Sequence, residues 1–357
     1  MGIGKKLAFL LPFSLPLIVV VGESLGGIFQ LALPLYVFGI IPFLDIIFGK
    51  DTQNPSQIEE EPLRSHIFLR WIPQVWVLCQ LSLLFWALSR ISNFSMGWTE
   101  FLLFALSVGI TTGGIGITVA HELGHRSNKW EQFLAKILLL SVSYVHFFIE
   151  HNRGHHTHVA THGDPATSRE GESFYKFFPR TLVGSFLSAW EIEWNTRKRK
   201  SQIPFSLKNE MVRLTFVQIS VMGCVGLFFG KWAFCFFLLQ SFFAFTLLEL
   251  VNYIEHYGLV RQLNSNGKPE KVEPIHSWNQ SSFLSNALLF HLQRHSDHHA
   301  HANRSYAILR HRPEAPELPF GYALMILIAL VPPLWNHLMI PRLIEWKQRT
   351  SGLTYSQ

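Results

Sequence analysis

Three short histidine-rich segments contain the residues of this chain that are best suited to bind metal ions. They are the sequences HELGHR from residue 121, EHNRGHH from residue 150 and LQRHSDHH from residue 292. Residues three or four positions apart share one face of an α-helix, so each segment can direct two imidazoles toward one point. Together the segments supply eight imidazoles, which is too many for one metal ion and suits two. The eight are His121, His125, His151, His155, His156, His295, His298 and His299.

A metal site is favoured over solvated or core histidines because two of the three segments end in adjacent histidines. Cysteine is absent from all three, which argues against a structural zinc site or an iron–sulfur cluster. Imidazole-rich sites suit iron, copper, zinc or nickel, so the residues alone leave the metal open. The three cysteines, Cys79, Cys224 and Cys235, lie in apolar runs and indicate no disulfide framework.

The composition indicates a membrane protein. Of 357 residues, 48% are hydrophobic, and the 31 phenylalanines and 11 tryptophans occur largely in long apolar runs. The formal net charge of +6 could suggest a nucleic-acid partner. The basic residues flank apolar segments, however, so membrane orientation explains them better and no nucleic-acid partner is expected.

Six apolar segments approach the length of about 20 helical residues that crosses a hydrocarbon core. The predicted spans are residues 7–22, 26–48, 69–88, 98–120, 211–230 and 232–251. The basic start and first apolar run also resemble a signal peptide, but no A-x-A-like cleavage site follows, so a retained span is favoured. We therefore predict an all-α integral membrane protein, a single domain over residues 1–357, with six transmembrane helices in three hairpins.

The histidine segments lie in two regions outside the spans, 121–210 and 252–317. Residues 130–148 are apolar but contain Lys136 and His146, which predicts an interfacial or protein-buried helix leading to the second histidine segment. Residues 318–340 are also apolar, but the pair Pro332-Pro333 interrupts them. That segment is predicted to be re-entrant or interfacial.

The basic residues predict which side of the membrane the histidine regions face. Three hairpins place both termini and all the histidine segments on one side, and only Arg90 and Lys231 fall in the three predicted outer turns. The other 28 of the 30 lysines and arginines lie on the histidine side or at its helix ends. The positive-inside rule therefore predicts a cytoplasmic histidine-rich cap.

The last span ends in polar residues, and the fourth span is rich in glycine. Glu249, Asn252 and His256 stand at i, i+3 and i+7, on one stripe at the end of the last span. An ionisable group there is costly without a partner or a task, so the stripe either caps a polar interior or contributes His256 as a ninth ligand. In the fourth span, four glycines between 109 and 116 indicate either close helix packing or room for a substrate between helices.

Four motifs together resemble those of the membrane alkane 1-monooxygenases (alkane ω-hydroxylases), within the membrane fatty acid desaturase/hydroxylase superfamily. They are HELGHR, EHNRGHH followed by Val159-Ala160-Thr161 and Asp164-Pro165-Ala166, NYIEHYGL, and LQRHSDHH. The resemblance extends from about Asp45 to Arg310. It implies a six-helix membrane bundle holding a di-iron centre, two non-haem iron ions bound almost wholly by histidine. It also implies hydroxylation of a terminal methyl group with O2 and electrons from rubredoxin.

The resemblance also implies which residues bind the irons. Transferred position by position, the ligands are His121, His125, His151, His155, His156, His256, His295, His298 and His299. The remaining histidines match no ligand position and are expected to be structural: His66, His146, His158, His162, His276, His291, His301, His311 and His337. Metal-bound imidazoles usually donate their second N–H to a partner, and Glu122, Glu249 and Asp297 are the candidate carboxylates. Glu249, Asn252 and Asp297 are the candidate catalytic residues.

The implied reaction attacks an unactivated C–H bond, which offers neither an acidic proton nor a leaving group. Its hydroxylation therefore needs a redox cofactor. The expected substrates are medium- or long-chain n-alkanes that enter from the bilayer and leave as primary alcohols. The nearest alternatives are related membrane di-iron enzymes acting on methyl-arenes (xylene-type) or on fatty-acyl chains, as hydroxylases or desaturases. A metal transporter is disfavoured because transport sites normally lie near the membrane midplane.

Electrons are expected to arrive from the cytoplasm, with the chain in a bacterial inner membrane. The sequence contains no Gly-rich dinucleotide fingerprint after a strand and no Cys-rich rubredoxin domain. A separate rubredoxin, reduced by its reductase, is therefore the expected donor. The basic run Arg197–Lys200, with Arg310 and Arg312, could dock a small acidic redox protein, although such runs are equally typical of contact with anionic lipid.

Overall fold

The computed structural model describes residues 1–93 and 96–353, and this part of the chain is helical, with isolated β-bridges but no strand. Short 3-10 segments are η1, η2, η6 and η7, and η3, η4 and η5 are π-helical. The segments are α1 (Ile3–Ala8), η1 (Leu11–Phe13), α2 (Ser14–Leu25), η2 (Gly27–Leu31), α3 (Ala32–Leu35), η3 (Tyr36–Ile40), α4 (Ile41–Phe48), α5 (Gln57–Arg64), α6 (Ile67–Ile91), α7 (Trp98–Ile110), η4 (Thr111–Ile117), α8 (Thr118–Gly124), α9 (Lys129–Leu140), α10 (Phe147–Glu150), η5 (His151–His155), α11 (His156–His158), α12 (Phe174–Arg199), α13 (Glu210–His256), η6 (Pro274–His276), α14 (Phe283–Leu288), α15 (His295–Ala300), η7 (Tyr306–Ile308), α16 (Tyr322–Ala329) and α17 (Pro332–Leu353).

Five helical runs in the described part of the chain are long and apolar enough to cross a membrane. They are Ile3–Leu25, Gly27–Phe48, Ile67–Ile91, Trp98–Gly124 and Glu210–His256. The pair α16 and α17 qualifies as a sixth only when the two helices are taken together, and they meet at a bend of 119°. The prediction of an all-helical membrane protein is therefore confirmed, and the bend occurs beside Pro332, as expected for residues 318–340.

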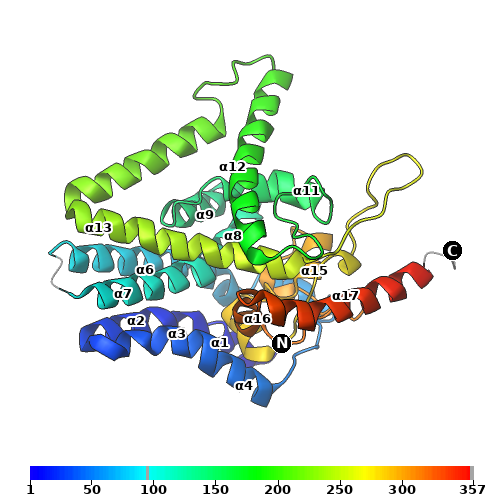
Figure 1. Ribbon diagram of the computed structural model, residues 1–357, viewed down its shortest axis with the longest axis horizontal. Helices are drawn as coiled ribbons and strands as arrows, with labels where there is room; N and C mark the ends of the chain where they lie inside the picture. Colours follow the sequence, from blue (N-terminus) through cyan, green and yellow to red (C-terminus); the bar gives the residue numbers. More distant parts are fainter. Residues whose placement is uncertain (94–95, 354–357) are drawn as a thin grey trace.

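The long helix α13 contains both of the last two predicted spans. Its 47 residues would measure about 70 Å if straight, more than twice a hydrocarbon core of about 30 Å. The backbone leaves the helical region at Gly230, with φ of 84° and ψ of 176°, a conformation open to glycine because it has no Cβ. The two arms of α13 consequently meet at an angle at the left of Figure 1.

The predicted single helix over 130–148 is wrong in one respect. Helix α9 ends at Leu140, and α10 begins only at Phe147. Between them Ser143 adopts a positive φ of 54°, and the turn brings the Tyr144 hydroxyl to donate to Glu249 at 2.6 Å. The buried hydrogen bond offsets the interruption of the helix.

Contacts at the two ends of the apolar helices show how their connections are grouped. At one end, Arg90 pairs with Glu23 (Nε to Oε1, 2.8 Å), and the rings of Trp98 and Trp232 lie 5.4 Å apart. At the other end, the N-terminal ammonium pairs with Glu59 at 2.8 Å. In Figure 1 the end with Arg90, Trp98 and Trp232 is at the left, and the histidine helices α8, α11 and α15 lie nearer the centre. The turn predicted between the third and fourth spans includes residues 94 and 95, which lie outside the described residues.

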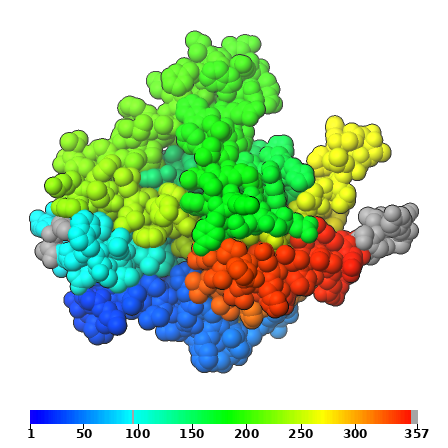
Figure 2. Space-filling view, viewed as in Figure 1, coloured from blue at the N-terminus to red at the C-terminus, as the bar shows by residue number. Residues whose placement is uncertain are grey.

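The C-terminal pair and α12 cover different faces of the molecule. In the space-filling view, α16 and α17 (orange to red) lie across the front, between the N-terminal helices and α12. Helix α12 (green) runs upward past the apolar helices, and its last residues are at the top, well away from α15 in Figure 1. The basic run Arg197–Lys200 therefore stands apart from the histidine helices (Figure 2).

Candidate metal centre and adjoining cavity

The structure gathers all nine proposed ligand histidines into two groups. Within each group, one ligand atom from every residue lies within 4.8 Å of those of the others. The first group is His121, His125, His151, His156 and His298. The second group is His155, His256, His295 and His299. These residues come from α8, η5, α11, α13 and α15, so four regions distant in sequence converge on one place.

The spacing between ring nitrogens matches the edges of a coordination polyhedron. Two nitrogens that each lie about 2.1 Å from one ion are about 3.0 to 3.4 Å apart at right or tetrahedral angles. Nε2 of His156 lies 3.1 Å from Nε2 of His151 and 3.1 Å from Nε2 of His298. Because Nε2 carries at most one hydrogen, hydrogen bonds alone do not explain such an array. The donor sets of both groups therefore fit a metal ion.

The expectation that each i,i+4 pair shares one ion is only partly confirmed. His121 and His125 fall in the first group together, and His295 and His299 fall in the second group together. The pair His151 and His155, however, divides between the groups, because η5 is π-helical. A π-turn closes its hydrogen bond at i+5, which aligns His151 with His156 instead.

The adjacent histidines connect the two groups. His156 belongs to the first group and His155 to the second, and His298 and His299 divide in the same way. Neighbouring residues on a helix point in different directions, so one helical turn can supply ligands to two metal ions. The rings of His156 and His299 lie 4.6 Å apart between centroids, which places the two groups side by side.

Burial prepares the imidazoles for metal binding. Desolvation, followed by the charge of neighbouring imidazoles, holds the pKa of the His125, His151 and His298 rings well below 6.5. The same causes lower the pKa of His295 and His299. These rings are consequently neutral at pH 7, the form that ligates metal.

The carboxylate that holds a ligand ring is Asp164, which the sequence interpretation did not assign. Its Oδ2 lies 2.9 Å from Nδ1 of His155 and also accepts from Thr167 Oγ1 at 2.6 Å. Burial opposes a charge on His155, but Asp164 outweighs it and raises the pKa of that imidazole. Asp164 begins the Asp164-Pro165-Ala166 motif, and this motif was the sequence feature that could have identified it. A second unassigned residue, Glu255, places Oε2 3.1 Å from Nε2 of His295.

The four residues predicted to support the ligands or to act in catalysis make other contacts. Glu249 accepts from Tyr144, from Thr181 Oγ1 at 2.9 Å and from Asn252 Nδ2 at 3.2 Å. No described contact joins its carboxylate to a histidine of either group. Three neutral donors therefore hold this carboxylate inside the helix bundle, and its role beside a ligand ring stays a prediction. Asn252 does line the cavity described below.

Asp297 and Glu122 hold the chain around the ligands. Asp297 accepts from Arg304, from the Arg310 backbone N–H and from Arg312, at 2.6 to 2.9 Å. Glu122 accepts from Arg126 Nη2 at 2.7 Å and from the Tyr306 backbone N–H at 3.1 Å. Arginine and backbone donors occupy these carboxylates, and their role in orienting a ligand ring also stays a prediction.

The nine histidines expected to be structural lie outside both groups in the described part of the chain. His291, for example, is buried, and its Nδ1 lies 3.0 Å from the Tyr306 carbonyl oxygen. Two of the predicted docking residues also have internal partners, since Arg310 pairs with Glu60 and Arg312 with Asp297.

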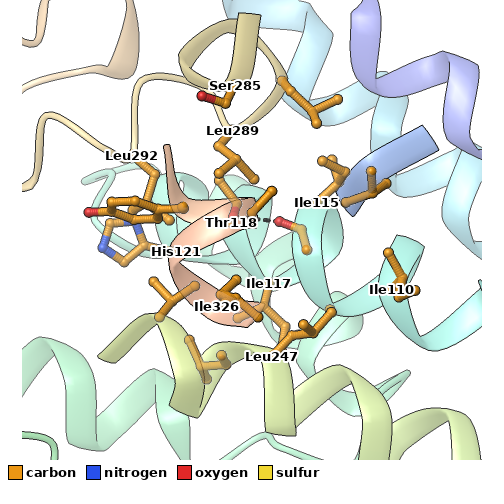
Figure 3. A pocket seen from close by; sticks show the side chains of 18 of the residues that line it. Ile110, Ile115, Ile117, Thr118, His121, Leu247, Ser285, Leu289, Leu292 and Ile326 are labelled. Carbon is orange, nitrogen blue, oxygen red and sulfur yellow. Dashed lines mark hydrogen bonds between the residues drawn. The ribbon is translucent and has the colours of Figure 1, made fainter. Parts of the chain in front are cut away.

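An apolar cavity ends at the histidine groups. His121, His151 and His295 lie in its wall, with Asn252, Glu255 and Tyr322. Most of the remaining wall is Ile, Leu, Val and Phe from α2, η3, α4, α7, η4, α13, α14 and α16. Figure 3 shows His121 and Ile110 toward opposite ends, with Ile115, Leu247, Leu289 and Ile326 between them. The cavity can hold an apolar chain with one end near the imidazoles.

The glycines of the fourth span lie at close helix contacts and in the cavity wall. A Cβ on Gly109, Gly113 or Gly116 would lie within 2.0 to 2.5 Å of Phe243, Ala244 or Gln80, respectively. These three permit close helix packing. Gly114 lines the cavity, and a Cβ there would meet no atom within 4 Å.

Comparisons with known proteins agree with this geometry. The fatty acid desaturase family model matches residues 96–329. "Alkane 1-monooxygenase 2" of Pseudomonas aeruginosa is 45% identical over 86% of this chain and 82% of the relative. "Alkane 1-monooxygenase 2" of Alcanivorax borkumensis is 43% identical over 86% of this chain and 81% of the relative. The xylene/toluene monooxygenase hydroxylase component of Pseudomonas putida is 30% identical over 68% of this chain and 65% of the relative.

Proposed function

The chain belongs to the alkane 1-monooxygenase family, within the fatty acid desaturase superfamily, and on that premise we propose that it hydroxylates the terminal methyl group of medium- or long-chain n-alkanes. The products are primary alcohols. The observation that carries the proposal is the apolar cavity that ends at two groups of converging imidazoles. The proposed cofactors are two non-haem iron ions, one in each group, and O2 is the co-substrate.

When bound, the two irons supply the redox chemistry that activates O2. The residues of the chain hold the imidazoles, exclude water and position the substrate. Asp164 fixes the ring of His155 through Nδ1. The apolar wall desolvates the alkane, which is as apolar as lipid and enters from the bilayer. Its terminal methyl group lies at the His121 end of the cavity.

We test this function with purified protein in detergent. The expected result is about two irons per chain and 1-dodecanol from dodecane, in the presence of rubredoxin, its reductase and NADH. Iron content is measured by elemental analysis and products by gas chromatography. Protein that contains zinc alone and consumes no O2 contradicts the proposal.

A methyl-arene substrate is the second candidate, because a xylene/toluene monooxygenase component is among the relatives. The alkane relatives match with higher identity and over more of their length. Fatty-acyl hydroxylation or desaturation is a third outcome that the same product analysis detects. Two irons without alcohol from linear alkanes would favour these alternatives.

The orientation in the membrane is part of the proposal. We infer six spans in three hairpins, with α13 providing the last two spans on either side of Gly230. The histidine cap and both termini lie in the cytoplasm, and the chain resides in a bacterial inner membrane. The supporting observation is that Arg90 and Lys231 lie at the end of the bundle opposite the N-terminus, where few basic residues occur.

Rubredoxin is the proposed electron donor. Because Arg310 and Arg312 pair with Glu60 and Asp297, and Arg197 pairs with Glu193, residues 198–200 are the remaining part of the docking surface inferred from the sequence. Lys198→Glu with Lys200→Glu should raise the KM for rubredoxin if the run docks it. An unchanged KM, insensitive to salt, would favour contact of the run with anionic lipid.

A further inference from the structure

Glu255 is a buried carboxylate whose surroundings indicate a cation. It precedes His256 at the end of α13, is 1% exposed and lines the cavity beside Tyr322. The Tyr322 hydroxyl approaches this carboxylate, but in the described part of the chain no hydrogen bond of normal geometry satisfies Oε1, and no lysine or arginine pairs with it. An isolated ionised carboxylate is strongly disfavoured in an apolar interior. The described ion pair of this side chain is with His295 alone.

The nitrogen that Glu255 approaches is already surrounded by donor atoms. Nε2 of His295 lies 2.8 Å from Nε2 of His299, 3.2 Å from Nε2 of His256 and 3.1 Å from Oε2 of Glu255. When Nε2 of His295 binds a metal ion, it carries no hydrogen and cannot donate to Glu255. A nitrogen lone pair and a carboxylate oxygen 3.1 Å apart repel each other unless a proton or a metal ion lies between them. A proton cannot occupy that place when Nε2 of His295 binds the metal.

The two histidine groups also differ in their donor number. The first group offers five imidazoles and the second only four. A divalent ion bound by neutral imidazoles alone retains its full charge in a site from which water is largely excluded. Asp164 lies behind His155 on one side of the second group, and Glu255 lies on the cavity side.

We propose that Glu255 supplies a carboxylate donor to the metal ion of the four-histidine group. Each group then has five protein donors, and the second ion gains a negative ligand. The assignment rests on the metal-binding part of the proposed function and is independent of the substrate and of the electron donor.

The test is a titration of metal-free protein in detergent with Co2+, followed by absorption spectroscopy. The variants are Glu255→Gln and, as the matched control, Glu23→Gln, a buried glutamate that pairs with Arg90 at the opposite end of the apolar helices. In Glu255→Gln we expect at least tenfold weaker binding of one of two Co2+ ions. We also expect the intensity of its d–d bands to change, because fewer donors surround that ion. Glu23→Gln should retain the wild-type affinity and spectrum.

Two readouts keep the result interpretable. Normal loading of the five-histidine group in Glu255→Gln shows that the variant is folded. If Glu255→Gln does not fold, Glu255→Asp, which retains the charge on a side chain one carbon shorter, should show a smaller change in the same band.

Three outcomes overturn the proposal. Wild-type affinity and spectrum in Glu255→Gln exclude Glu255 as a ligand. Weaker binding with an unchanged spectrum assigns Glu255 to positioning His295. Wild-type protein that binds fewer than two Co2+ ions removes the metal-binding premise. Absence of alkane oxidation, by contrast, contradicts the proposed function and leaves the Co2+ result unaffected.

Discussion

At the scale of single residues, the ligand rings depend on partners that hold them in place. The structure provides such a partner for His155 in Asp164, which is fully buried and accepts from Thr167 and from the Ala166 backbone N–H. These additional bonds fix the carboxylate before any metal arrives. A ligand that is already oriented loses less conformational freedom when the ion binds.

Asp164→Asn should weaken metal binding in the four-histidine group by about 10- to 100-fold, because the ring of His155 loses its anionic partner. The measurement is competition for Co2+ with a chelator of known affinity. Thr167→Val, which removes only one hydrogen bond to Asp164, should cause a smaller change in the same direction. Wild-type affinity in Asp164→Asn would show that the His155 contact does not contribute to binding.

Gly114→Leu should shift the products toward shorter alcohols. Gly114 lines the cavity, and a Cβ at this position meets no atom within 4 Å. Gly114 lies seven residues, or about 10 Å along the helix, before His121. The measurement is gas chromatography after turnover of an alkane mixture. Gly113→Ala is the control, since its Cβ would lie 2.5 Å from Ala244, and it should lower thermal stability instead. The same product distribution in Gly114→Leu and wild type would exclude a substrate chain at this position.

The sequence could predict which histidines gather but not what holds them. Regular spacing and adjacent pairs distinguished eight of the nine, and His256 was assigned through the family resemblance. One partner, Asp164, lies in the loop between α11 and α12, which has no periodic pattern, and the other, Glu255, lies on α13 outside the three histidine segments. Asp164 and Glu255 were therefore missed, while Asp297 was assigned from its place beside His298 although three arginines compete for it.

At the scale of elements, Glu193 of α12 connects three segments. Its Oε1 accepts from Arg153 of η5 at 2.5 Å, and its Oε2 accepts from the backbone N–H of Glu210 at the start of α13 at 2.8 Å. The side chain is 1% exposed. This carboxylate therefore holds the second histidine segment against the helix that carries His256.

Glu193→Gln should lower the free energy of unfolding by about 1.5 to 3 kcal/mol, the range for hydrogen bonds to charged groups. The measurement is thermal unfolding in detergent at pH 7. Glu191→Gln, at an exposed position of the same helix, is the control and should have little effect. Equal transition midpoints for Glu193→Gln and wild type would show that these bonds do not stabilise the fold.

The stability of wild type relative to Glu193→Gln should decrease at low pH, and the pKa of Glu193 gives the direction. Burial raises the pKa of Glu193, but the bonds from Arg153 and the Glu210 N–H outweigh it, and the pKa lies below 4.5. The stabilisation is consequently complete above the unfolded pKa of about 4.3 and decreases as the pH falls through the folded pKa. The difference between wild type and Glu193→Gln should stay constant from pH 8 to 6 and narrow below pH 4.

Helix type could be predicted for most elements, but the π-turns could not. Apolar runs place α6, α7 and α13 within a few residues of the predicted spans. The π-turns η3, η4 and η5 all border the cavity or the histidine groups. They depend on tertiary contacts rather than on a periodic pattern, and functional sites commonly contain them.

At the scale of the whole molecule, the connections of the apolar helices separate into two ends. Arg90 and Lys231 are the basic residues of the predicted outer turns, and the N-terminus lies at the histidine end. The hydropathy of the spans and the positions of the lysines and arginines predicted that the connections would divide between two ends. They did not predict how α16 and α17 bend across the front, because a proline pair marks a break but fixes no angle.

Lys231→Cys should react with a membrane-impermeant thiol reagent in intact spheroplasts, whereas Lys200→Cys should react only after permeabilisation. The reason is the proposed cytoplasmic position of the histidine cap. Labelling is measured by mass spectrometry, in a background in which Cys79, Cys224 and Cys235 are replaced by Ala. The opposite pattern of labelling would reverse the orientation.

The order of the ligands along the chain has a consequence for biosynthesis. His121 and His125 emerge early from the ribosome, whereas His295, His298 and His299 follow the end of α13. Because chains fold progressively from the N-terminus during synthesis, the apolar helices are inserted while both donor sets are incomplete. The apolar helices therefore reach the membrane before either donor set is complete, and both groups have all their donors only after translation of the third histidine segment.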